Sequence, residues 1–129
     1  MSAAQPYTLT RFIGELANMV AGLLVWAAHF AVVYSVHAVS CARGLNHWTV
    51  LGFELVPFTI TVATVLALAG SLAVLAIALR DLRDMRDAHG EVQDSQRFLT
   101  YTSATVAGFS ILAIVWVALP VFFIEPCAL

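Results

Sequence analysis

Three long runs of apolar residues, separated by two short polar connections, dominate the chain. The runs cover residues 12–39, 50–79 and 98–124. Each exceeds the about 20 residues that a helix needs to cross a hydrocarbon core of about 30 Å. All three are apolar on every face and much longer than the roughly 10-residue alternating strands of a membrane barrel. The pattern therefore predicts an all-α integral membrane protein with three transmembrane helices, in a single domain over residues 1–129.

The composition supports a membrane protein and excludes several other classes. Hydrophobic residues make up 61% of the chain and charged residues 11%, whereas roughly a quarter of the residues in soluble domains are charged. A net charge of −2 without any lysine argues against nucleic acid as a partner. Because the first run is too long for a signal peptide and follows only Arg11, we expect it to remain as a signal anchor.

The arginine distribution predicts the orientation in the membrane. The connection 80–97 contains more arginines than the first connection or the N-terminal tail, which hold Arg43 and Arg11 respectively. Because positive charge is retained on the cytoplasmic side, we expect this connection to be cytoplasmic. The N-terminus is then inside and the C-terminus outside, as in a multi-pass protein of the bacterial inner (cytoplasmic) membrane.

An Arg-Asp repeat follows the second run and defines a charge collar that comprises Arg80, Arg83, Asp84, Arg86 and Asp87. The repeat predicts that the second helix continues into the cytosol, with oppositely charged residues four apart, and that Gly90 ends it. Asp94 or Ser95 is expected to cap the third helix. The collar is either a docking surface or a solvated helix end, and the second interpretation is favoured because exposed ion pairs contribute little.

Two cysteines fall on the same predicted side of the membrane. Cys41 ends the first run and Cys127 follows the third, so the orientation above places both at the outer face. In an oxidising compartment they could form a disulfide. The alternative is that they are two unrelated small residues at helix ends.

Histidines in an apolar run require an explanation, because an unsatisfied polar group in lipid costs several kcal/mol. His29 lies near the middle of the first run, and His37 lies about 12 Å closer to the outer surface on a different face. A bis-histidine haem b would need a second ligand at the depth of His29, and the second and third runs contain no histidine. The favoured interpretation of His29 is a neutral side chain that hydrogen-bonds across a helix interface.

The outer connection contains further polar residues. Glu54 is expected at the depth of His37, so the two can form an outer-face polar pair. A copper or zinc cluster of His37, Cys41, His47, Glu54 and Cys127 is an alternative, although the spacing matches no compact metal motif and the cluster competes with the disulfide for the thiols. The third interpretation is an interfacial belt that includes Trp48.

Small residues recur at intervals of about one helical turn in all three runs. Such residues let helix backbones approach closely in lipid. They are Gly14, Asn18 and Gly22 in the first run, Ala63, Ala67 and Ser71 in the second, and Ser103, Ala104, Ala107 and Gly108 in the third. Hydroxyls in the second and third runs are expected to bond the preceding turn of their own helix. No nucleophile with a base, phosphate loop or pair of mid-membrane carboxylates is visible, which argues against an enzyme.

The segment Trp26-Ala-Ala-His-Phe30, followed by Tyr34, Cys41 and Arg43-Gly44, resembles a pattern at the first helix of small multi-span inner-membrane proteins of proteobacteria. The genes of those proteins accompany haem-copper (cytochrome c) oxidases. The resemblance implies an accessory or assembly role beside a respiratory oxidase and carries over no catalytic residues.

These observations predict a non-catalytic accessory subunit of a larger membrane complex. Its partners would be membrane lipids and other integral membrane subunits, with no small-molecule substrate and no cofactor of its own. Five residues of the first helix are expected to contact the partner: Trp26, His29, Phe30, Tyr34 and His37. The alternative is a membrane redox protein that binds haem b or copper through His29 or His37, with further ligands from a partner subunit.

Overall fold

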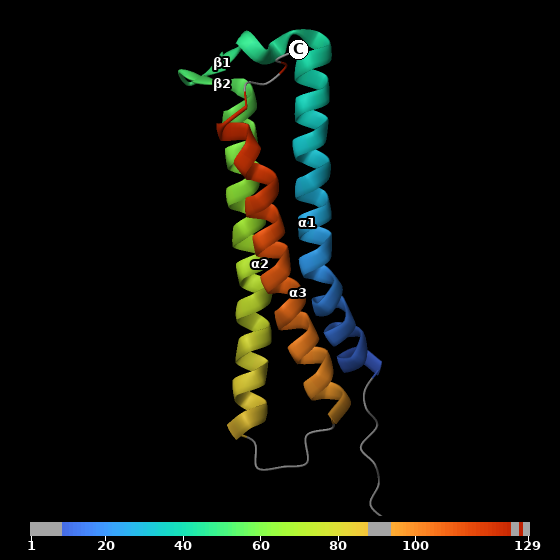
Figure 1. Ribbon diagram of the computed structural model, residues 1–129. Coiled ribbons are helices and arrows are strands. Elements are labelled where there is room, and N and C mark those ends of the chain that lie inside the picture. Colours follow the sequence, from blue (N-terminus) through green and yellow to red (C-terminus); the bar gives the residue numbers. More distant parts are fainter. Residues whose placement is uncertain (1–8, 88–93, 125–126, 128–129) are drawn as a thin grey trace, which may run out of the picture.

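Three long helices lie side by side and form a bundle (Figure 1). The computed structural model describes residues 9–87, 94–124 and 127. The helices are α1 (Leu9–Arg43), α2 (Leu55–Asp87) and α3 (Asp94–Ala118). Each is long and apolar enough to cross a membrane. The prediction of an all-α bundle with three candidate spans is therefore confirmed.

The end of the bundle between α1 and α2 carries a short hairpin that the apolar pattern did not predict. A 3₁₀ turn, η1 (Leu45–His47), leads into β1 (Thr49–Val50), which pairs antiparallel with β2 (Phe53–Glu54). Leu51 and Gly52 between the strands have φ of 54° and 84°, as a two-residue hairpin turn with two positive φ values requires. The second helix therefore begins at residue 55, five residues later than predicted. We call the end of the bundle that carries β1 and β2 the hairpin end.

The opposite end of the bundle, between α2 and α3, is called the connection end. As the Arg-Asp repeat predicts, α2 continues to Asp87, and α3 begins at Asp94; the expected stop at Gly90 lies outside the described residues. Arg80 and Asp84 are oppositely charged residues four apart in the collar. Within the described residues, they form no ion pair. At the hairpin end, α3 stops at Ala118 and continues as η2 (Leu119–Phe122), because Pro120 lacks the N–H of a regular helix.

Close helix contact depends on a seam of small and polar side chains. The buried residues of α3 are spaced three or four apart: Thr100, Ser103, Ala107, Ser110, Ile114 and Ala118. On α1, a Cβ atom added to Gly22 would lie 3.2 Å from the Cα of Ala107. Gly14 and Gly108 have nothing within 4 Å of such an atom. Of the predicted small residues, Gly22 and Ala107 thus form the close contact between α1 and α3.

Larger aliphatic side chains fill the core only towards the hairpin end. Val33 of α1 packs there with Val56 and Ile60 of α2. The partly buried residues Val36, Val117 and Val121 cover this cluster. Towards the connection end, the buried side chains of the described residues are smaller and more polar. The two ends of the bundle therefore differ in chemistry.

A disulfide joins the last turn of α1 to the segment after η2. Cys41 and Cys127 are bonded, with 5.5 Å between their Cα atoms and 86 residues between them in sequence. Of the two alternatives that the sequence leaves open for these cysteines, the structure contains the bonded one. The bond fastens the chain at the hairpin end, where α1 and α3 both finish.

Replacing Gly22 by alanine should destabilise the bundle by about 1–3 kcal/mol, because the added methyl group overpacks the contact with Ala107. Gly108→Ala is the matched control, since its Cβ meets no atom and helix propensity favours alanine. The free energy of unfolding, measured by titration with a denaturing detergent, compares the two. Equal effects would contradict the close contact.

The protein should show no alkylated thiol in its intact mass when it is denatured without reductant, because both cysteines are bonded. After reduction, the same treatment should add two alkyl groups. Replacing both cysteines by serine should lower the free energy of unfolding by about 2–4 kcal/mol. Labelling of both thiols before reduction would overturn the bond.

Candidate functional site

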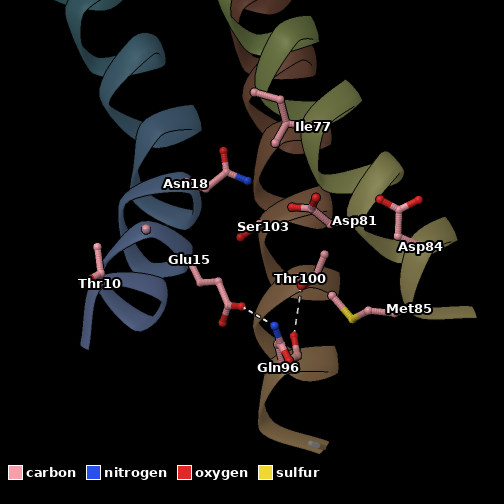
Figure 2. Close-up of a pocket in the computed structure, with 11 residues that line it drawn as sticks. Thr10, Glu15, Asn18, Ile77, Asp81, Asp84, Met85, Gln96, Thr100 and Ser103 are labelled. Carbon is pink, nitrogen blue, oxygen red and sulfur yellow. Dashed lines mark hydrogen bonds between the residues drawn. The ribbon is translucent and has the colours of Figure 1, made fainter. Parts of the chain in front are cut away.

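A polar pocket opens between the three helices at the connection end (Figure 2). Its volume is about 590 Å³, within the usual range of small-molecule sites. The polar lining residues come from all three helices: Thr10, Glu15, Asn18, Asp81, Asp84, Gln96, Thr100 and Ser103. The pocket exists because the seam on this side consists of small and polar residues that leave space between the helices.

One hydrogen bond between residues that line this pocket links α1 to α3, and a second lies within α3. The Gln96 side-chain amide donates to Glu15 Oε1 over 2.9 Å. The Thr100 hydroxyl donates to the backbone carbonyl oxygen of Gln96, one turn earlier in the same helix, over 3.0 Å. Figure 2 shows both contacts as dashed lines.

Ser103 and Asn18 line the inner part of the pocket. Ser103 is only 2% exposed. Figure 2 shows the Asn18 amide directed from α1 towards α3. Oxygen and amide groups together with carboxylates can bind a cation or ordered water. The described residues contain no group of three His, Cys, Asp or Glu side chains placed to hold a metal ion.

The sequence interpretation did not identify this pocket as a site. Glu15 is an acidic residue inside the first apolar run, which is by itself a signal of function. Its partner Gln96 is 81 residues away, and nothing in the apolar pattern pairs these two residues. The signal in Glu15 could therefore be found from sequence, but its surroundings could not.

His29 lies inside the bundle and hydrogen-bonds to another helix. It is 3% exposed, and its Nε2 lies 3.0 Å from Thr64 Oγ1 of α2. The Thr64 hydroxyl donates its hydrogen to the Ile60 carbonyl over 2.7 Å. It can therefore only accept from His29, which assigns the hydrogen of the neutral imidazole to Nε2. This is the interhelical hydrogen bond that the sequence favoured for His29.

This arrangement separates His29 from the other residues expected to contact a partner. A buried side chain cannot belong to an exposed contact surface. Ligation of a metal through Nε2 would also require loss of the bond to Thr64. Nδ1, the remaining lone pair, is buried and has no hydrogen-bond partner among the described residues.

Three aromatic side chains form a continuous ridge along α1, which we call the aromatic ridge: Trp26, Phe30 and Tyr34. Their ring centroids are 5.8 Å apart between Trp26 and Phe30 and 4.4 Å apart between Phe30 and Tyr34. Exposure increases along the ridge from the half-buried Trp26 to Tyr34, which is 62% exposed. His37, one turn further, is half-buried. Four of the five expected contact residues therefore have exposed surface on α1.

The outer-face polar pair of His37 and Glu54 is not formed. No hydrogen bond or ion pair joins them in the described structure, because Glu54 lies in β2, opposite Thr49, with its side chain exposed. The alternative copper or zinc cluster is also not assembled, since the disulfide occupies the sulfur atoms of Cys41 and Cys127. Trp48 is 64% exposed beside the hairpin, in keeping with the interfacial alternative.

Comparison with known proteins gives no assignment: no family model, curated protein or solved structure matches the chain.

Thr64→Val should lower the free energy of unfolding by about 1–2 kcal/mol, because the buried Nε2–H of His29 loses its acceptor. Thr61→Val is the matched control, since the exposed Thr61 hydroxyl bonds only the Pro57 carbonyl of its own helix. The control should change stability by a few tenths of a kcal/mol. Unfolding in mild detergent measures both, and equal effects would show that the His29–Thr64 bond contributes nothing.

Proposed function

We propose that this chain is a non-catalytic accessory subunit of a larger complex in the bacterial inner membrane. Its aromatic ridge would pack against a transmembrane helix of a partner subunit. The observation that carries the proposal is the position of Trp26, which is the central residue of the 35-residue helix α1. A tryptophan in the middle of a span is far from the membrane interfaces that tryptophan prefers, and its buried Nε1 has no hydrogen-bond partner among the described residues.

Exposed aromatic residues elsewhere follow the interfacial preference and give the contrast. At the hairpin end they are Trp48, Phe53, Trp116, Phe122 and Phe123, and at the connection end they are Phe12, Phe98 and Tyr101. These two groups resemble the aromatic belts that flank a hydrocarbon core. Phe109, in the middle of α3, is 68% exposed, but its ring is wholly apolar and lacks the interfacial preference of tryptophan.

The proposed orientation places the connection end in the cytoplasm and the hairpin end outside. The arginines of the collar support a cytoplasmic connection end through the positive-inside rule. The disulfide at the hairpin end supports an oxidising compartment on that side. These two arguments are independent, because one concerns insertion and the other concerns redox chemistry.

A respiratory haem-copper oxidase is the proposed partner, on the basis of the resemblance in the first helix. In this proposal the oxidase holds the cofactors and the present chain supplies packing contacts. The redox alternative, with haem b or copper bound through His29 or His37, has less support. His29 Nε2 is bonded to Thr64, so a metal at this atom would replace that hydrogen bond.

The proposal is tested by placing a photo-crosslinking amino acid at position 30 of the full chain in its native membrane. Position 109 is the matched control, because Phe109 is an exposed phenylalanine at mid-span on another helix. We expect position 30 to yield one crosslinked integral membrane protein, identified by mass spectrometry, and position 109 to yield lipid adducts. An oxidase subunit as that protein would establish the proposed partner.

Replacement of Trp26, Phe30 and Tyr34 by leucine should abolish co-migration with this protein on a native gel and leave the disulfide intact. Lipid adducts alone at position 30, together with a lone small oligomer on the gel, would refute the docking role.

A further inference from the structure

A second pocket lies at the connection end, between α2 and α3. Its volume is about 400 Å³. Three arginines line it: Arg83 and Arg86 from α2, and Arg97 from α3. Tyr101, one turn after Arg97, and the aliphatic side chains of Leu79 and Leu82 complete the wall. We call it the arginine pocket.

The Arg-Asp repeat of α2 distributes its charges between the two pockets. Asp81 and Asp84 line the polar pocket, whereas Arg83 and Arg86 line the arginine pocket. Met85 lines both, so the boundary between them runs along this residue. A repeat of three residues on a helix of 3.6 residues per turn keeps like charges on neighbouring positions of one side. The segment 81–86 of α2 therefore has an acidic side and a basic side.

The three guanidinium groups of the arginine pocket have no ion-pair partner in the described part of the chain. All three are exposed. Guanidinium groups form planar, bidentate hydrogen bonds with phosphate oxygens. Three of them, supplied by two different helices around one pocket, therefore suit a phosphate group.

The pocket also lies beside aromatic residues that are typical of a membrane interface, where lipid headgroups are found. Tyr101 and the neighbouring Phe98 are 61% and 70% exposed and belong to the proposed aromatic belt of the connection end. Leu79 and Leu82 provide apolar surface next to the arginines. We propose that the arginine pocket binds the phosphate headgroup of an anionic phospholipid, with the acyl chains along the apolar surface of α2 and α3.

A free phosphate ion offers the same charge but leaves the apolar wall without a ligand. An acidic protein segment would not explain why arginines adjoin residues at membrane depth. Basic pockets between transmembrane helices on the cytoplasmic side are a known arrangement for anionic lipid headgroups. The inference depends on the proposed membrane location and orientation, but not on the docking of a partner subunit.

The test is native mass spectrometry of the full chain in mild detergent, titrated with phosphatidylglycerol or with phosphatidylcholine of the same acyl chains. We expect phosphatidylglycerol to bind at least tenfold more tightly than phosphatidylcholine. Arg83→Gln combined with Arg97→Gln should weaken this binding at least tenfold. Arg83→Lys combined with Arg97→Lys keeps the charge but loses the planar donors, so it should give a loss of intermediate size.

Arg43→Gln combined with Arg80→Gln is the matched control, because it removes the same charge from residues outside the pocket. It should retain phosphatidylglycerol binding. Equal losses in the control and pocket variants would overturn the site and show only general attraction by positive charge. If millimolar inorganic phosphate displaced phosphatidylglycerol and bound with the same affinity, the lipid assignment would be overturned in favour of a free-anion site. An intact disulfide in every variant verifies folding.

Discussion

Close approach of helices is the constraint on which the bundle depends. In lipid, apolar side chains gain no hydrophobic stabilisation by leaving the solvent, so helices associate through packing and hydrogen bonds. Gly22 satisfies this constraint by admitting the α3 backbone to within 3.2 Å of where a Cβ would lie. The His29–Thr64 hydrogen bond provides the corresponding link between α1 and α2. The two contacts lie seven residues apart on α1, so one side of this helix binds both neighbours.

The same constraint explains why the connection end contains polar space. Small and hydroxyl-bearing side chains permit close contact but cannot fill the volume where helices diverge. Glu15, Gln96 and Thr100 occupy the resulting gap with hydrogen bonds. At the hairpin end, Val33, Val56 and Ile60 fill the interior instead. Aliphatic packing therefore fills the interior at the hairpin end, and polar contacts join the helices at the connection end.

The number of helices could be predicted from sequence because an apolar run longer than a bilayer has few alternatives. The start of the second helix could not be predicted, because Val50, Leu51 and Phe53 of the hairpin are as apolar as residues of a helix in lipid. Hydrogen bonding of His29 across an interface follows from the cost of an unsatisfied polar group, but Thr64 as its partner depends on the relative rotation of two helices. The same limit applies to Glu54, which lies in the exposed hairpin strand β2. Residues from three helices meet in the polar pocket, and no local pattern relates them.

The disulfide has a consequence for how the finished molecule is distinguished from an incomplete one. Cys41 is made early in synthesis, but Cys127 follows α3 in the sequence and reaches Cys41 only when α3 has taken its place beside α1. A chain that stalls with fewer helices inserted keeps a free thiol at the end of α1. The bond can therefore form only in molecules whose third helix has packed beside the first.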